Sequence, residues 1–336
     1  MKFRLKYLAP LGALAMALSM TACSSSSSTP TASGSDTSSA SNASSASYAL
    51  ILKALDSDFW KNMKAGAIAE AQKQGVTLDV YAGQSETDTA GQVTLLQNAI
   101  TKKYTAIGVA PISPTNMNAA VAQATKAGIY IVNVDEQFDT QSLQTLGGAA
   151  QAFTTTDNVA AAKMAGDYLV QTLGAGSDQV AIVAGQAGDT SSAERVQGVT
   201  ESFTAAGYNI VAQQPGNWDA TTAYNLAQSY ISKYPDLKAI YACNDVMAMG
   251  VLKAVQASGK DIAVVGNDGD SDAIASVASG TGLLATIKQD SATEGAKVVD
   301  LMIQYATQKP AIDPTVIPDP TYIPAILVTK DNASTQ

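Results

Sequence analysis

The chain has 336 residues, of which 46% are hydrophobic, 29 are acidic and 20 are basic, giving a net charge of −9. This balance argues against a nucleic-acid-binding protein, because few basic side chains are available to neutralise phosphates. The chain contains no histidine, which excludes Ser-His-Asp and Cys-His catalytic sites and imidazole metal sites.

The first 22 residues predict a signal peptide. Three basic residues fall within the first six positions, and residues 8–20 form a mostly apolar run that is too short to span a bilayer. The run ends in small residues before Cys23, which resembles a bacterial lipoprotein cleavage site. We therefore expect residues 1–22 to be removed and Cys23 to carry a lipid anchor. Ordinary secretion after cleavage at Ala22 is the alternative.

Residues 23–47 form the predicted tether. Residues 24–47 contain 13 serines and no aromatic or large aliphatic side chain, so they cannot bury enough apolar area to offset their ordering entropy. A lipidated Cys23 followed by a disordered segment describes a domain held at the outer face of the cell membrane or in the periplasm. The other cysteine, Cys243, falls in an apolar strand, so we expect no disulfide.

The folded region begins with a strand–helix–strand unit. Tyr48–Leu52 is a short apolar run that predicts a strand buried on both faces. Apolar residues then recur at helical spacing from Trp60 to Ala71, Gly75 marks the helix end, and residues 76–80 form the next strand. Parallel strands joined by a helix cross over right-handed, so the unit predicts an α/β fold.

The same alternation continues through the first half of the chain. Residues 93–100 predict a helix, and residues 106–110 and 129–134 predict buried strands. Ser113-Pro114 is typical of a helix start, leading into a helix over 117–127. Residues 137–156 are polar and contain two glycines, and we expect them to be the loop that crosses into a second domain.

The second half repeats the pattern from residue 158 to residue 307. The expected helices cover 158–173, 192–206, 221–234, 246–257 and 292–307, and the expected strands cover 180–184, 210–212, 239–243, 262–266 and 284–287. Strict alternation predicts parallel sheets covered by helices. Two similar halves predict two sheets that face a cleft, a common place for a small-molecule site.

Polar and aromatic residues gather just beyond the ends of the predicted strands, where ligands bind in open parallel sheets. Those directly after strands are Lys53, Asp135, Glu136, Asn244, Asp268 and Gln289, and those on loops and helix starts are Phe59, Trp60, Asp189, Arg195 and Trp218. Carboxylates, amides and a guanidinium each pair with two neighbouring hydroxyls, while aromatic rings pack on the face of a sugar ring. The set therefore predicts a sugar site.

Five of these residues also have a purely structural interpretation. Trp60 fits the core face of its helix, and Asp135 and Asp268 fit solvated turns. Asn244 fits the N-cap of the helix that follows it, and Arg195 fits a helix surface. Their common location at one edge of two sheets favours the binding site.

The sequence predicts no enzyme, no cofactor and no metal site. No G-x-x-x-x-G-K phosphate loop occurs. Residues 268–272 begin like a calcium loop, but Ala273 and Ser279 stand where that loop requires glycine and glutamate. Asp135 and Glu136 are adjacent at a strand end, where two carboxylates rarely point at one glycosidic bond.

Several segments resemble the periplasmic binding proteins of ribose and allose transport, and the D-allose-binding members most closely. They are LKALDSDFW (52–60), YIVNVDEQFD (130–139), AFTTTDNVA (152–160), QPGNWDATTA (214–223), AIYACNDVMAMG (239–250), VVGNDG (264–269) and ATIKQ (285–289). The resemblance runs from Tyr48 to about Lys330. It implies an α/β fold of two Rossmann-like lobes with parallel sheets, joined by a three-strand hinge.

The resemblance also implies domains, ligand contacts and partners. The N-terminal lobe would comprise residues 48–155 plus about 290–317, and the C-terminal lobe residues 156–289 plus about 318–336. The ligand contacts would be the residues named above, enclosing a monosaccharide that a monomeric protein delivers to the permease of an ABC importer. D-allose or a related hexose such as psicose is expected rather than ribose, because Lys53 and Glu136 form a charged pair for an extra hydroxymethyl group.

Three departures from the family pattern leave the identity of the sugar open. Asp58 stands where the family commonly has proline, Asp189 stands where allose binders have asparagine, and Val196 replaces a second arginine. Two other functions remain as alternatives: a receptor for a sugar-derived signal, and a surface lipoprotein of unrelated activity. A transcriptional repressor of the same fold is excluded by the leader and by the lack of a basic DNA-binding start.

Overall fold

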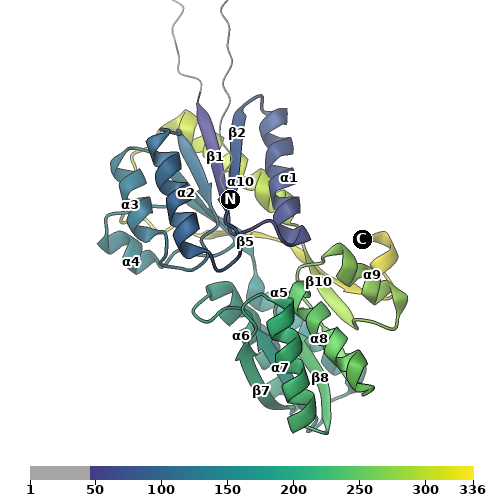
Figure 1. Ribbon diagram of the computed structural model, residues 1–336. Coiled ribbons are helices and arrows are strands. Elements are labelled where there is room, and N and C mark those ends of the chain that lie inside the picture. Colours follow the sequence, from purple (N-terminus) through teal and green to yellow (C-terminus); the bar gives the residue numbers. More distant parts are fainter. Residues whose placement is uncertain (1–45) are drawn as a thin grey trace, which may run out of the picture. The chain divides into compact units, whose positions relative to one another are not determined.

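The computed structural model describes residues 46–336, so the predictions for the signal peptide, for Cys23 and for nearly all of the tether lie outside the described residues. The described chain forms two six-stranded sheets, each covered by helices (Figure 1). Their strand orders are β11-β5-β4-β3-β1-β2 and β12-β10-β9-β8-β6-β7. All pairings are parallel except the one between β10 and β12. The predicted α/β fold of two lobes is confirmed.

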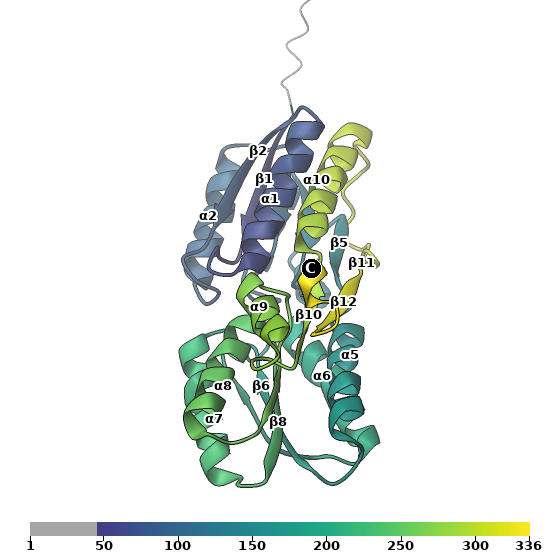
Figure 2. The ribbon, with the colours of Figure 1, turned by 90° about the vertical axis from the view of Figure 1, so that its right-hand side faces the viewer.

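The first lobe contains the opening unit and two later segments. Its elements are β1 (Ser47–Leu52), α1 (Asp58–Lys73), β2 (Thr77–Ala82), α2 (Thr89–Thr101), β3 (Ala106–Val109), α3 (Asn118–Lys126), β4 (Tyr130–Val134), α4 (Thr140–Thr145), β5 (Ala152–Thr156), α10 (Ser291–Gln308) and β11 (Pro320–Ile323). Helices α1 and α10 lie side by side on one face of the sheet (Figure 2). Their backbones approach closely at Gly66 and Gly295, where a Cβ atom would clash with the facing backbone.

The second lobe is continuous apart from its last strand. It contains α5 (Asn158–Leu173), β6 (Gln179–Ala184), α6 (Thr190–Ala206), β7 (Asn209–Pro215), α7 (Ala220–Lys233), β8 (Leu237–Ala242), α8 (Asp245–Ser258), β9 (Ala263–Val265), α9 (Ser271–Ser279), β10 (Ala285–Gln289), β12 (Ala325–Thr329) and the short 3₁₀ helix Ala333–Thr335. Helices cover both faces of the sheet, which is why its central strands are nearly all apolar.

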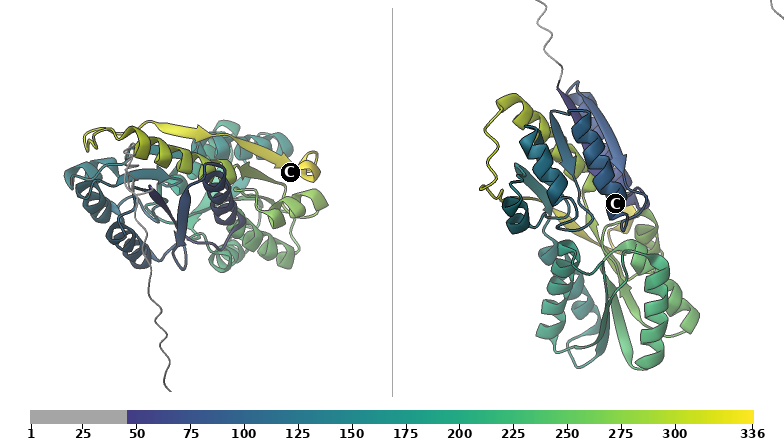
Figure 3. Two further views of the ribbon diagram at one scale, coloured as in Figure 1. Left: turned by 90° about the horizontal axis from the view of Figure 1, so that it is seen from above. Right: turned by 60° about the vertical axis from the view of Figure 1, so that its left-hand side comes forward.

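The chain crosses between the lobes three times, after β5, after β10 and between β11 and β12. The C-terminal segment, yellow in Figure 3, runs along both lobes. Pro320–Ile323 pairs with β5 in the first sheet, whereas the sequence analysis placed residues from about 318 onward in the second lobe. The last crossing therefore lies at Pro324, a few residues later than expected.

Two local predictions were wrong. Residues 137–156 do not form a loop, because they contain α4 and the fully buried strand β5, whose polar threonines hid the strand pattern. Ser113 is not the start of α3, because it forms a turn closed by the side chain of Asn116; the helix itself, expected over 117–127, covers Asn118–Lys126. Helix α9 and the last two strands were also not predicted.

No helix within residues 46–336 combines the length and the apolar character needed to cross a membrane.

Candidate functional site

A cavity lies where the carboxyl ends of the two sheets face each other. The space between its walls is about 290 Å³, part of which is open to solvent. Its walls are formed by Lys53, Phe59, Trp60, Glu86, Asp135, Ser191, Arg195, Trp218, Asn244 and Asp268. Eight of the eleven residues predicted from the sequence line this cavity. The other three, Glu136, Asp189 and Gln289, contact the lining residues from behind.

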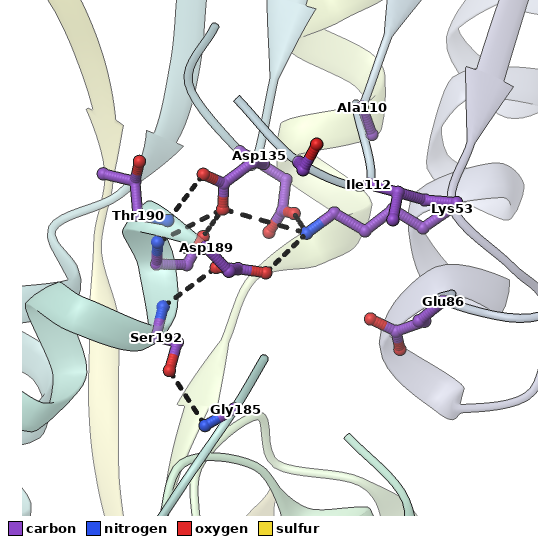
Figure 4. Close-up of polar contacts among 12 residues, drawn as sticks. Lys53, Glu86, Ala110, Ile112, Asp135, Gly185, Asp189, Thr190 and Ser192 are labelled. Atoms are coloured by element: carbon purple, nitrogen blue, oxygen red, sulfur yellow. Dashed lines mark hydrogen bonds and ion pairs between the residues drawn. The ribbon is translucent and has the colours of Figure 1, made fainter. Parts of the chain in front are cut away.

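Lys53 follows β1 and places its ammonium group in a cluster of carboxylates (Figure 4). Its Nζ lies 3.1 Å from Asp135 Oδ2, 3.6 Å from Asp189 Oδ2 and 3.9 Å from Glu136 Oε2. Burial alone would lower the pKa of Lys53, but the charges of Asp135, Asp189 and Glu136 outweigh it and raise that pKa above its ordinary value. Lys53 is therefore a fixed cation that bridges the two lobes.

Glu136 points away from the cavity, toward the start of α6 in the other lobe. Its Oε1 accepts a hydrogen bond from Thr190 N at 2.7 Å, and its Oε2 accepts from Ser191 N at 3.2 Å and from Ser191 Oγ at 2.7 Å. Burial, followed by the charge of Asp189, raises the pKa of Glu136 to about 8. Glu136 therefore links the two lobes. The expected pair of Lys53 and Glu136 is present at 3.9 Å, but Glu136 is not among the residues that line the cavity.

A second ionic group stands on the opposite wall, around Arg195. The guanidinium donates from Nη1 to Asp268 Oδ1 at 3.0 Å and to the carbonyl of Cys243 at 2.6 Å, and from Nε to Asn158 Oδ1 at 2.8 Å. Gln289 donates to the same oxygen of Asp268 at 2.7 Å. Arg195 is therefore fixed from three sides, and it is not on a helix surface.

Two of the three carboxyl groups that line the cavity, those of Asp135 and Asp268, share a pattern. Asp135 turns Oδ2 to Lys53, and Asp268 turns Oδ1 to Arg195. Within residues 46–336, the other oxygen of each carboxylate accepts no hydrogen bond. Asn244 likewise uses only part of its side chain within the protein. Its Oδ1 caps α8, while its amide NH₂ donates to no group of the described chain. Both interpretations of Asn244 are therefore compatible, and three polar groups remain available to a ligand.

Two tryptophans and a phenylalanine supply flat surfaces. Trp60 packs edge-on against Phe59 with ring centroids 4.8 Å apart. The indole of Trp60 donates to Glu86 Oε1 at 2.9 Å, and the indole of Trp218 donates to Asp189 Oδ2 at 3.2 Å. These hydrogen bonds fix the orientation of both rings, so the aromatic planes are in place before a ligand arrives.

The backbone is strained at the site. Six non-glycine residues of the described chain have positive φ, and three of them line the cavity: Asp135 (64°), Trp218 (60°) and Asp268 (133°). Such conformations cost on the order of 1–3 kcal/mol each and persist where the surrounding structure holds them. At Asp268 the holding group is Asp245, whose Oδ2 accepts from the next two backbone N–H groups. Strain concentrated on lining residues favours a binding role for them over a role as solvated turns.

Sequence reasoning missed Glu86 and Ser191. Glu86 lies on the loop after β2, so the rule that polar residues gather beyond strand ends applies to it as well, four residues past the strand. Burial raises the pKa of Glu86 to about 8, against the opposing charge of Lys53. A carboxyl group that keeps its proton at neutral pH can both donate and accept hydrogen bonds.

No cluster of three or more histidine, cysteine or acidic side chains is placed to hold a metal ion in the part of the chain from residue 46 onward.

Known proteins resemble this chain over nearly all of its folded region. The family model described as a periplasmic binding protein domain matches residues 48–310. The D-allose-binding periplasmic protein of Escherichia coli is 40% identical over 288 residues, which cover 85% of this chain and 92% of that protein. The ribose import binding protein of Salmonella typhimurium is 33% identical over 75% of this chain and 82% of its own length.

Solved structures agree with the sequence relatives. A solute-binding protein from Actinobacillus succinogenes with bound D-allose superposes with a TM-score of 0.79 and 27% identity, covering 87% of this chain and all of that one. A solute-binding protein from Agrobacterium vitis with bound D-fucose gives a TM-score of 0.77 at 30% identity, covering 86% and 97%. These proteins bind and deliver substrates and are not enzymes. From its sequence, its two-lobed fold and the cavity between the lobes, the chain belongs to the periplasmic binding protein family.

Proposed function

We propose that the protein captures a monosaccharide, D-allose or a related hexose such as psicose, between its lobes and delivers it to an ABC importer. The observation that carries this proposal is that the carboxylates of Asp135 and Asp268 each use only one of their two oxygens within the protein. Each holds a buried cation with one oxygen and leaves the other for a ligand hydroxyl. An anionic or phosphorylated ligand would be repelled by these carboxylates, whereas the hydroxyls of a neutral polyol can donate hydrogen bonds to them.

The aromatic residues support a ring-shaped ligand. Phe59, Trp60 and Trp218 all line the cavity, and hydrogen bonds fix both indoles. The C–H faces of a pyranose ring pack well on such planes, while the ring hydroxyls point to the polar walls. We assign the ligand contacts to the ten lining residues and place Glu136, Asp189 and Gln289 behind them.

The relatives support a hexose. The Escherichia coli relative is named for D-allose, and the Actinobacillus succinogenes structure holds D-allose. Since Glu136 is engaged by α6, the group we assign to the extra hydroxymethyl is Glu86, which lines the cavity together with Lys53 and belongs to the same lobe (Figure 4). Ribose lacks that group and would leave a buried carboxyl without a ligand partner, so we expect ribose to bind roughly tenfold to a hundredfold more weakly.

The test is a calorimetric titration of the protein with D-allose, D-psicose, D-galactose, D-xylose and D-ribose. We expect one of the hexoses to bind most tightly, with D-allose or D-psicose first. Ribose or xylose as the tightest ligand would contradict the hexose assignment. Failure of all five sugars to bind would instead contradict the monosaccharide proposal itself.

We further propose that the protein acts outside the cytoplasm, anchored by a lipid on Cys23. The basic and apolar leader and the small residues before Cys23 support export and lipidation. The serine-rich segment after Cys23 would give the lobes freedom to reach the importer. The second candidate is a receptor for a sugar-derived signal, which would use the same cavity but a different membrane partner.

A further inference from the structure

Two helices that face each other across the cleft begin without a cap of their own. In seven of the ten described helices, the N-cap is an aspartate or asparagine whose side chain accepts from a backbone N–H of its own first turn. Helix α1, with N-cap Ser57, and helix α9, with N-cap Asp270, have no such bond. Their first N–H groups therefore need partners from elsewhere.

Each of these two helices takes its partner from the other lobe. Asp270, at the start of α9, accepts through Oδ1 from the backbone N–H of Phe59 in α1 at 3.1 Å. Asp58, at the start of α1, accepts through Oδ2 from the backbone N–H of Ser271 in α9 at 3.1 Å and also from its hydroxyl. The bonds from Ser271 lower the pKa of Asp58, so this carboxylate is ionised opposite the positive end of α9.

From this reciprocal geometry we infer that Asp58 and Asp270 are positioning residues that exchange helix caps between the lobes and hold the closed form around the ligand. Asp58 lies in the first lobe and Ser271 in the second, so the two caps exist only while the lobes are together. When the cleft opens, both helix starts lose their side-chain partners at once.

The cap exchange is tied to the walls of the ligand cavity. Phe59, whose N–H is capped by Asp270, lines the cavity together with Trp60. Asp270 follows the lining residue Asp268 by two positions, and Asp245 holds the N–H of Asp270 at 2.9 Å. The caps therefore fix one wall of the cavity against the other. Closure brings Phe59 and Trp60 of the first lobe and the carboxylate of Asp268 of the second lobe to the same cavity.

The inference rests on the proposed closure around a sugar, and its first test measures amide hydrogen exchange at Phe59 and Ser271 by NMR. Exchange is followed in the full chain without sugar and with saturating D-allose. We expect Asp270→Ala to speed exchange at Phe59 and Asp58→Ala to speed exchange at Ser271, in each case in the opposite lobe. Loss of a helix cap corresponds to roughly 2- to 30-fold in an equilibrium constant.

Matched controls are available on the same two segments. Asp56 and Asp272 are exposed carboxylates near α1 and in the first turn of α9, and neither accepts a hydrogen bond from the other lobe among the described residues. Asp56→Ala and Asp272→Ala should leave exchange in the opposite lobe unchanged. Asp58→Asn keeps an acceptor oxygen without the charge and should fall between the wild type and Asp58→Ala.

The second readout is the rate at which D-allose dissociates. Both alanine variants should release D-allose roughly 2- to 30-fold faster, with little change in association, because the sugar enters the open form. Faster exchange across the lobes in either ligand state supports the cap exchange, even if the wild type binds no D-allose and the proposed function fails. Unchanged exchange at both amides in both states would overturn the inference. Because Asp58 is partly exposed, its variant remains a test if Asp270→Ala does not fold.

Discussion

Glu294 provides the sharpest test of the electrostatics at the hinge. Its side chain is fully buried at the start of α10, just after the second crossing between the lobes. One oxygen accepts from Thr156 Oγ1 at 2.9 Å, and the other has no hydrogen-bond partner within the described chain. Burial, reinforced by the charge of Asp135, raises the pKa of Glu294 to about 8. We predict that Glu294→Gln stabilises the protein at alkaline pH.

The sign follows from proton linkage. In the unfolded chain Glu294 titrates near pH 4.3, whereas in the fold it keeps its proton until about pH 8. The folded state therefore binds more protons between these values, and its stability falls as the pH rises through that range. For a single group with these two pKa values, the loss is about 1 kcal/mol at pH 5 and on the order of 4 kcal/mol at pH 8.

Glutamine keeps the shape and the acceptor for Thr156 but carries no titrating proton. The free energy of unfolding of the variant should therefore match that of the wild type at pH 5 to within about 1 kcal/mol. At pH 8 it should exceed the wild-type value by on the order of 4 kcal/mol. This difference corresponds to roughly 10 °C in the unfolding temperature. Other buried carboxyl groups with raised pKa, such as Glu86 and Asp245, contribute equally to both proteins and cancel in the comparison.

The assay is thermal unfolding followed by circular dichroism from pH 5 to pH 8.5. Glu201→Gln, on an exposed position of α6, serves as the matched control and should run parallel to the wild type. A difference between wild type and Glu294→Gln that stays constant across this range would refute the reasoning, as would a variant that is less stable than wild type at pH 8.

Three further predictions concern the ligand and the anchor. Glu86→Gln should weaken D-allose binding about tenfold in calorimetry while leaving ribose binding unchanged, and an equal loss for both sugars would remove Glu86 as the hexose determinant. Asp268→Ala should weaken D-allose binding at least a hundredfold, because it leaves the buried Arg195 guanidinium without its carboxylate; retained affinity would contradict the ligand role of Asp268. Cys23→Ser should move the protein from the membrane fraction to the soluble fraction with unchanged sugar affinity, and persistent membrane association would argue against lipidation.

Much of the fold could be predicted because hydrophobic periodicity is strong where both faces of a sheet are covered. β1, β4 and β8 are mostly apolar, and each was found within a few residues. β5 failed for the opposite reason, since its three threonines are buried through hydrogen bonds that the sequence does not display. The last two strands are short and half exposed, so their pattern is weak.

The cavity was predictable to the extent that it obeys the rule on strand ends. Lys53, Asp135 and Asp268 follow buried strands directly, and the structure brings all three to one cavity. The direction of a side chain is a different matter. Glu136 and Asp135 are neighbours, yet only Asp135 lines the cavity, whereas Glu136 bonds to the start of α6 in the other lobe. Which acid caps which helix likewise depends on tertiary contacts, and Asp58 and Asp270 carry no local signal of their exchange.

The crossing at Pro324 has a consequence for how the protein is made. The segment on either side of this one residue supplies an edge strand to each sheet, β11 to the first and β12 to the second. Helix α10, which packs against α1, also comes from the last part of the chain. The first lobe therefore cannot complete its sheet until almost the whole polypeptide has left the ribosome. Contacts between segments that are distant in the sequence form slowly. A chain that is to be exported would therefore stay unfolded long enough to pass through a translocation channel.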